Sequence, residues 1–415
     1  MTQVPNSGPC SLCLRFVFLT WTSFLPIAFS GCEEVQKAVN DAKSEVSGSP
    51  SPSTTPAVPT NAVPESMSPA APSPAPVVGP TPAEIIARFQ ALQPSEITDG
   101  DLTLLASTSG TESTVSQINL TGNRHVTSSG LAQLATLKTL TSLNLVSSGL
   151  SPADLSLVGN VHSLNELILS ATQADDTVIN SLAAIPHLQV LDLSGTPITA
   201  AAGAGLSKMQ ELRELKLVDT ATDDQFIGLI TSLPLQTLRL GRTRVTGAAV
   251  PELLRMKSLE VLGVEYNGIP GIAWKGASKA NLTELSVAET PFGLEGLDAI
   301  KGMDSLEILN IYNTGLVEHK AANVFRSFPK LRVLNAGGNA VSDAGVEVFF
   351  KGLKNLEELY LGGNKYITDQ GLASLTGLKK LQLLDLNNTK CGQAGALALK
   401  KKLPDCKIRV NNMEY

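Results

Sequence analysis

The chain has 415 residues, of which 43% are hydrophobic and 17% are charged, and its formal net charge is −6. The hydrophobic content is enough for a large core, whereas the acidic balance and the 4% aromatic content argue against a nucleic-acid-binding protein. The five cysteines are too few and too scattered for a disulfide scaffold or a zinc site. No run of 18 apolar residues is present, so we expect no membrane-spanning helix in the mature chain.

Residues 1–31 have the pattern of an export signal. Arg15 precedes 14 largely apolar residues, and two small residues come directly before Cys32. One positive charge, a short apolar run and a small-residue cleavage site are typical of a secretory signal peptide. Ser30-Gly31-Cys32 resembles the lipobox of bacterial lipoproteins. This resemblance implies acylation of Cys32 and a membrane-anchored lipoprotein of the bacterial cell envelope. The alternatives are a secreted or periplasmic protein with a free cysteine, and an uncleaved signal anchor.

Two segments without repeats follow the signal. Residues 32–46 form a short polar segment, and residues 47–82 contain 11 prolines among 36 residues that are otherwise mostly Ser, Ala, Thr and Val. Such a composition cannot bury enough apolar surface to offset the entropy of ordering, so we predict a disordered tether. In polyproline II geometry the tether would reach at most about 110 Å. The alternative, a ligand of an SH3-type domain, usually carries basic residues, which this segment lacks.

From residue 83 onward the chain reads as one repeat array. Units with the spacing LxxLxL recur every 23, 24 or 25 residues, a period that is typical of a stacked solenoid. We expect an N-terminal cap at residues 83–114, about 12 repeats at residues 115–405, and a final strand with a tail at residues 406–415. The leucines that open the units are Leu140, Leu164, Leu188, Leu212, Leu235, Leu259, Leu282, Leu306, Leu331, Leu356 and Leu381.

The spacing within a unit predicts a strand followed by a turn and a helix. The alternation Leu-x-Leu places two apolar side chains on one face of a short strand, and Leu372 and Leu375 share one helical face. No unit can bury its own apolar face, so stacked units create one core. The repeats resemble bacterial leucine-rich repeats that are related to those of F-box adaptors, over residues 97–410. This resemblance implies an α/β leucine-rich-repeat solenoid of right-handed strand–helix repeats, with a parallel sheet on the concave side and helices on the convex side.

A short polar residue follows each strand at a constant position. Hydroxyl or amide groups at this position can bond to backbone groups that point into the interior where the chain turns. We therefore predict a buried ladder formed by Ser148, Thr172, Thr196, Thr220, Thr243, Asn267, Thr290, Thr314, Asn339, Asn364 and Thr389.

The sequence contains no motif for phosphate binding, metalloprotease or serine hydrolase chemistry, so we expect no enzymatic activity and no cofactor. His162 and His187 fall in polar loops and are interpreted as surface residues that hold no metal. Cys391 and Cys406 should lie at opposite strand ends. We predict a buried thiol for Cys391, with a disulfide as the alternative. Residues 400–402, three lysines, are interpreted as charges that suit the end of a helix, with a nucleic-acid patch as the alternative.

The concave face is the candidate partner-binding surface. Tyrosines at strand centres and strand exits offer a large contact area at low entropic cost, which is typical of protein-binding patches. Two of these tyrosines are two repeats apart, about 10 Å at the spacing of neighbouring strands. The alternative is a chance scatter of aromatic residues. The residues of one predicted patch are Asn310, Tyr312, Asn335, Glu358, Tyr360 and Asp385, and Tyr266 is a further candidate partner-binding residue on this face.

A second cluster on this face is basic. Its cations can be balanced by Glu214 and Asp219, so we interpret it as a solvated ion-pair network and not as a ligand site. Its members are Lys216, Arg239, Arg242 and Arg244.

These patterns favour one function over a second. The favoured function is a non-enzymatic interaction scaffold that is exported, anchored to a membrane through Cys32, monomeric, and bound to a protein or envelope partner of unknown identity. The alternative is an adaptor subunit of a degradation or signalling complex, by analogy with F-box leucine-rich-repeat proteins. That alternative would need an F-box or a catalytic domain, which the sequence lacks, and it conflicts with the predicted export signal.

Overall fold

The structure is a computed structural model that describes residues 79–110, 115–317 and 324–415. The predicted signal peptide, Cys32, the polar segment and nearly all of the predicted tether lie outside these residues. The described residues belong to a compact unit that spans Pro76–Tyr415. Within this described part, no helix is both long and apolar enough to cross a bilayer.

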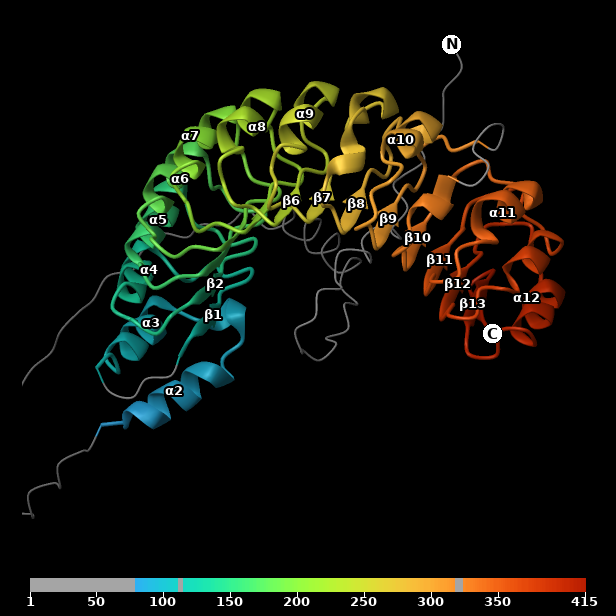
Figure 1. Ribbon diagram of the computed structural model, residues 1–415. Coiled ribbons are helices and arrows are strands. Elements are labelled where there is room, and N and C mark those ends of the chain that lie inside the picture. The colour runs from blue at the N-terminus through green and yellow to red at the C-terminus, as the bar shows by residue number, and fades with distance from the viewer. Residues whose placement is uncertain (1–78, 111–114, 318–323) are drawn as a thin grey trace, which may run out of the picture. The chain divides into compact units, whose positions relative to one another are not determined.

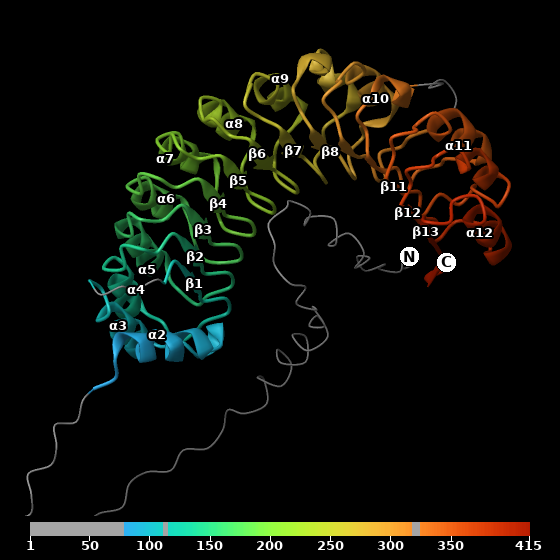
Figure 2. The same ribbon diagram turned by 60° about the horizontal axis from the view of Figure 1, so that its bottom comes forward.

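The described strands form one 14-stranded sheet in which the strand order follows the chain order. Every neighbouring pair from β1 to β13 is parallel, and only β14 runs antiparallel to its neighbour β13. In Figure 2 the strands line the inner side of the curved unit and the helices line its outer side. The strands are β1 (Gln117–Asn119), β2 (Ser142–Asn144), β3 (Glu166–Ile168), β4 (Val190–Asp192), β5 (Glu214–Lys216), β6 (Thr237–Arg239), β7 (Val261–Gly263), β8 (Glu284–Ser286), β9 (Ile308–Asn310), β10 (Val333–Asn335), β11 (Glu358–Tyr360), β12 (Leu383–Asp385), β13 (Lys407–Val410) and β14 (Met413–Glu414).

The outer layer consists of short helices, several of them 3-10 helices (Figure 1). The segment that contains Leu372 and Leu375 is a 3-10 helix, so the helical half of the repeat is less regular than the expected α-helix. The α-helices are α2 (Pro82–Ala91), α3 (Asp99–Ala106), α4 (Ser128–Leu134), α5 (Pro152–Ser156), α6 (Asp176–Leu182), α7 (Gly203–Leu206), α8 (Asp224–Ile230), α9 (Val250–Leu253), α10 (Gly293–Ala299), α11 (Asp343–Phe350) and α12 (Gln393–Lys400). The 3-10 helices are η2 (Pro94–Glu96), η3 (Leu157–Asn160), η4 (Ala200–Ala202), η5 (Gly247–Ala249), η6 (Gly271–Trp274), η7 (Ala277–Lys279), η9 (Val324–Ser327) and η10 (Gly371–Leu375).

The core is one continuous apolar cluster that runs from Phe89 to Val410. The central leucine of a strand, such as Leu191 or Leu359, is fully buried, while its two neighbours point to the opposite face. Because side chains alternate along a strand, each three-residue strand contributes its central side chain to the core. Each coil thus shields the apolar face of the next one, as the repeat spacing predicts.

The polar ladder is confirmed for ten of its eleven predicted members. The threonines donate to the carbonyl oxygen three residues earlier, as Thr172 does to Leu169 at 2.7 Å and Thr389 to Leu386 at 2.7 Å. The asparagines also reach the preceding repeat, and Asn364 donates to Ala336 and to Leu361. The prediction is wrong for Ser148, whose buried hydroxyl has no hydrogen-bond partner among the described residues.

Both ends of the array are covered. At the N-terminal end, α2 begins at Pro82 and buries Ile85 and Phe89, and capping boxes close the first turns of α2 and α3. At the C-terminal end, the predicted last strand is β13, and the chain then turns back as β14, which the sequence did not reveal. At the C-terminal end, the last parallel strand β13 is thus not an open edge, because β14 pairs with it.

Candidate partner-binding face

The central outward residues of successive strands lie in one column across the inner face. Strand pairing sets Asn310 opposite Asn335, Asn335 opposite Tyr360, and Tyr360 opposite Asp385. The predicted register of this part of the patch is therefore present in the structure. The column continues towards the N-terminus through Ser286 and Gly263.

The amides and the carboxylate of this column form hydrogen bonds with the backbone of their own repeats. Asn310, Asn335 and Asp385 each accept a hydrogen bond on Oδ1 from the backbone N–H two residues later, at 3.1, 3.1 and 2.9 Å. Such a bond fixes the turn at the strand exit. Asn335 is only 8% exposed, so its expected role as an exposed contact residue is wrong.

Tyr360 and Glu358 form a pair on β11. The Tyr360 hydroxyl donates to Glu358 Oε2 at 2.6 Å, and both side chains are half-buried. Burial raises the pKa of Tyr360 well above its usual range, and the hydrogen bond to Glu358 raises it further. The Tyr360 hydroxyl donates to Glu358 Oε2, and a backbone N–H donates to Asp385 Oδ1. The second oxygen of each carboxylate accepts no hydrogen bond from the described residues and can accept one from an outside donor.

The Tyr312 ring packs against the backbone of the next repeat at two glycines. A side chain added at Gly338 would place its Cβ 3.0 Å from the Tyr312 ring, and one added at Gly337 would place it 3.2 Å away. A Cβ at Gly337 would also lie 2.7 Å from Gly362 O, and Gly338 has a positive φ of 67°, so glycine is favoured at both positions. The following repeat again has glycine twice, at Gly362 and Gly363, and both are partly exposed. We call Tyr312, Glu358, Tyr360 and Asp385 the tyrosine cluster.

Tyr266 does not belong to the tyrosine cluster. It is 39% exposed, follows β7, and packs against the Arg242 guanidinium, whose central carbon is 4.5 Å from the ring centroid. Two repeats separate it from Tyr312, and it has a positive φ of 58° at the strand exit. Tyr266 is therefore a separate candidate contact residue on the same face.

Three of the four cations of the basic cluster form ion pairs, and their partners differ in part from those expected, whereas Arg244 forms no ion pair within the described residues. Lys216 pairs with Glu214 at 2.7 Å and Arg242 with Asp219 at 3.9 Å, as predicted. Arg239 instead crosses Gly263 and reaches Glu284 at 2.5 Å. Replacing Gly263 by a larger residue would block this path, a constraint that the sequence pattern did not reveal.

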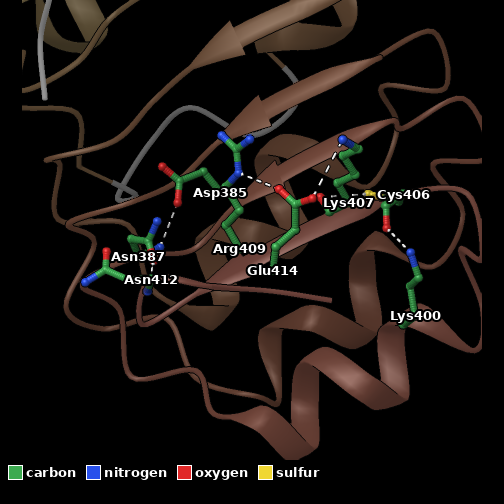
Figure 3. Close-up of polar contacts among 8 residues, drawn as sticks. All are labelled: Asp385, Asn387, Lys400, Cys406, Lys407, Arg409, Asn412 and Glu414. Atoms are coloured by element: carbon green, nitrogen blue, oxygen red, sulfur yellow. Dashed lines mark hydrogen bonds and ion pairs between the residues drawn. The ribbon is translucent and has the colours of Figure 1, made fainter. Parts of the chain in front are cut away.

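The C-terminal border of the tyrosine cluster contains residues that sequence reasoning missed (Figure 3). Arg409 donates to Glu414 at 3.1 Å, and Lys407 lies 3.7 Å from the same carboxylate. The Asn387 side chain accepts from the backbone of Asn412 at 2.7 Å. These contacts could have been predicted only if the pairing of β13 with β14 had been recognised. They fix the border next to Asp385.

The described residues show no group of side chains that could hold a metal ion. His162 and His187 are exposed, as expected for surface residues, and His187 Nδ1 lies 3.3 Å from Glu211. Cys391 and Cys406 are both buried and free, so the buried thiol predicted for Cys391 is present and the disulfide alternative is wrong. Burial raises the pKa of each thiol to about 11.

Comparisons with known proteins agree with this architecture. A model of the leucine-rich repeat matches residues 184–207 and 352–375. Leucine-rich repeat-containing protein 42 of Danio rerio is 39% identical over 109 residues, which is 23% of this chain and only 26% of that relative's length. An internalin of Listeria monocytogenes has a similar fold, with a TM-score of 0.52 and 19% identity over 80% of this chain and 94% of that one. A leucine-rich-repeat protein of Leptospira interrogans gives a TM-score of 0.51 and 18% identity over 75% of this chain and 80% of its own.

The repeats, the sheet and these matches together define the class. The described part of the chain has the solenoid fold of leucine-rich-repeat proteins, and two of its coils match the leucine-rich-repeat model. The likeness to the two solved structures extends to the fold alone.

Proposed function

We propose that this protein is a non-enzymatic interaction scaffold that binds a protein partner through the tyrosine cluster on its inner face. One observation carries the proposal. Tyr312 follows β9 and packs against Gly337 and Gly338 of the next repeat. Tyr360 lies two repeats from Tyr312 on β11, bonded to Glu358 and opposite Asp385, and Gly362 and Gly363 follow this strand. We call these four glycines, which offer bare backbone, the glycine floor. Aromatic rings that flank bare backbone let a partner approach closely, while the carboxylates offer acceptors to its donors.

Because of the glycine floor, we favour this part of the inner face as the binding site over the strands nearer the N-terminus. Further towards the N-terminus, Arg239 and its two glutamates fill the space above Gly263. Next to the tyrosine cluster, Gly362 and Gly363 stay partly exposed. A side chain of the partner can therefore lie between the Tyr312 ring and Asp385.

We further propose that the scaffold is exported and held at a bacterial membrane by acylation of Cys32. The small residues before Cys32 and the apolar run of residues 16–29 support this part of the proposal. A proline-rich tether would give the repeats freedom to meet partners at a distance from the bilayer.

The binding proposal is tested by capture of envelope proteins on immobilised protein. We expect Tyr312→Ala combined with Tyr360→Ala to lower capture at least tenfold, because two aromatic anchors of about 1–2 kcal/mol each are removed. The matched control is Tyr266→Ala combined with Tyr366→Ala, two exposed tyrosines outside the cluster. Equal capture by both double variants would remove the cluster from the proposal.

The anchoring proposal is tested by metabolic labelling with a clickable fatty acid. We expect label on the wild type and on Cys13→Ser but none on Cys32→Ser, because only the thiol after the small-residue motif would be acylated. Label that persists on Cys32→Ser would contradict acylation at this residue and leave the binding face unaffected.

A further inference from the structure

Charge is unevenly distributed along the chain. Residues 324–415 contain 14 lysine and arginine residues but 8 aspartate and glutamate residues, a formal charge of +6 in a chain whose formal charge is −6. The C-terminal repeats are thus basic in an otherwise acidic protein. A field of one sign at one end of a molecule orients it towards a partner of opposite charge.

Most of this positive charge lies on a single edge of the solenoid. The four turns at residues 326–330, 351–355, 376–380 and 401–405, which lie at or directly after the ends of η9, α11, η10 and α12, contain eight exposed cations and one acidic residue, Asp405. Arg332 and Glu357, which follow the first two of these turns, form an ion pair with each other at 2.8 Å. Five equivalent turns nearer the N-terminus, at 135–139, 159–163, 183–187, 207–211 and 230–234, contain two lysines and one glutamate. We call the eight cations the basic edge: Arg326, Lys330, Lys351, Lys354, Lys379, Lys380, Lys401 and Lys402.

Contacts between the turns make the basic edge continuous. Asn355 donates to Pro329 O at 3.0 Å and accepts from Lys380 at 2.9 Å. Lys379 donates to the backbone oxygen of Lys402 at 3.1 Å. These bonds join four successive turns, which stack beside α11 and α12 at the C-terminal end (Figure 1).

The basic edge is largely uncompensated. Lys351 pairs with Glu347 at 2.8 Å, and this is the one carboxylate partner of the basic edge among the described residues. The other seven cations have no ion-pair partner among the described residues. Two of them, Lys379 and Lys380, donate to oxygens within the basic edge, and the charge of Lys380 helps to lower the pKa of Glu357. In contrast, the cations of the inner face, such as Arg239 and Lys216, are paired with glutamates.

We infer that the basic edge docks onto the surface of a membrane that contains anionic phospholipid. Seven of the eight cations are lysines, whose compact charge binds phosphate without the directional fork of arginine. Lysine is depleted in protein interfaces, and the one aromatic residue of these turns, Phe328, is buried. A single-stranded nucleic acid would need exposed aromatic rings for stacking. Several lysines and arginines held next to a membrane surface are attracted to anionic lipid headgroups.

The test uses a chain that starts at residue 32, carries Cys32→Ser and keeps the whole compact unit of residues 76–415. It is sedimented with vesicles of phosphatidylcholine alone or with one third phosphatidylglycerol. We expect binding to the anionic vesicles only, and loss of that binding at high salt because screening weakens exposed charges. Binding to both kinds of vesicle would overturn the inference.

The decisive variant replaces four lysines that make no described side-chain contact: Lys330→Gln, Lys354→Gln, Lys401→Gln and Lys402→Gln. We expect the partition coefficient to fall about fivefold for each lysine, and a hundredfold or more for the four. The control with the same net charge carries Lys138→Gln, Lys208→Gln, Lys365→Gln and Lys390→Gln, all exposed and away from the basic edge. An equal loss in the control would refute a local docking surface. Tighter binding to a DNA duplex than to the vesicles would also refute the inference.

Discussion

Asn339 holds two neighbouring repeats together with one side chain. Its Nδ2 donates to Ala336 and Gly337 in its own repeat and to Ile311 in the preceding one. Its Oδ1 accepts from the backbone of Thr314 at 3.1 Å and Leu316 at 2.9 Å. A threonine at this position, as in most repeats, donates a hydrogen bond to a carbonyl oxygen of its own repeat. Asparagine is therefore the stronger cross-link of the two.

We predict that Asn339→Ala lowers the free energy of unfolding by about 3 kcal/mol, because five buried backbone groups lose a partner. Asn339→Thr should lose about half as much, since a hydroxyl can still reach the carbonyl of its own repeat. Denaturant unfolding measures both changes. Asn355→Ala, on an exposed turn, serves as the control and should change stability by less than about 0.5 kcal/mol. A loss below about 1 kcal/mol in Asn339→Ala would contradict this account of the ladder.

The buried thiols predict a pH dependence. Burial raises the pKa of Cys391 and Cys406 from 9 to about 11, so the folded state disfavours the thiolate. Their contribution to stability is complete below pH 9 and is lost as the pH rises towards 11. We expect the free energy of unfolding to fall over this interval more steeply in the wild type than in Cys391→Ala combined with Cys406→Ala. If the free energy of unfolding falls equally with pH in the wild type and in the double variant, the thiols are not the cause.

At the scale of elements, aspartates link successive helices on the outer layer. Asp343, the first residue of α11, accepts from the backbone and the hydroxyl of Thr368, each at 2.7 Å. Asp224 of α8 makes the same pair of bonds to Thr246. Each of these aspartates lies at the start of one helical segment and fixes the start of the next. The link adds a polar connection between coils whose helices are too short to be stable alone.

Glycine is required where the linking aspartate approaches the next helix. Asp369 accepts from the backbone of Gly395 at 3.1 Å, and a Cβ at Gly395 would overlap its carboxylate. We predict that Gly395→Ala destabilises the protein by about 2 kcal/mol through overpacking. Gly377→Ala, where a Cβ meets open space, should cost less than about 0.5 kcal/mol. Thermal unfolding compares the two variants, and equal melting temperatures would contradict the close-approach argument.

At the scale of the whole molecule, the repeat spacing predicted the parallel sheet, its register and the apolar core. The spacing succeeds because each coil contacts mainly its neighbours, so local patterns determine the fold. The binding face was harder to predict. Asn310 and Asp385 read as surface groups, yet each bonds to a backbone N–H two residues later, and the separation of Tyr266 from the tyrosine cluster depends on Arg242. Such roles follow from side-chain geometry, which a linear pattern does not contain.

The sequential strand order predicts a local response to truncation. Removing residues 406–415 deletes β13 and β14 and exposes β12, together with the core that Cys406, Ile408 and Val410 cover. We expect faster amide hydrogen exchange in β11 and β12 and unchanged protection in β2 to β6, because stability in a repeat array is a sum of neighbouring contacts. Removal of Tyr415 alone is the control. A uniform rise in exchange along the array would show instead that the repeats unfold as one unit.

The same one-dimensional order determines how the protein would respond to mechanical load. A force applied to the last residues meets only the terminal coil, which can detach while the other coils stay stacked. Every coil that detaches would release 23–25 residues, or about 80 Å of extended chain. The molecule would therefore lengthen in regular steps and recoil when the load is removed, like a spring and unlike a globular domain that ruptures once.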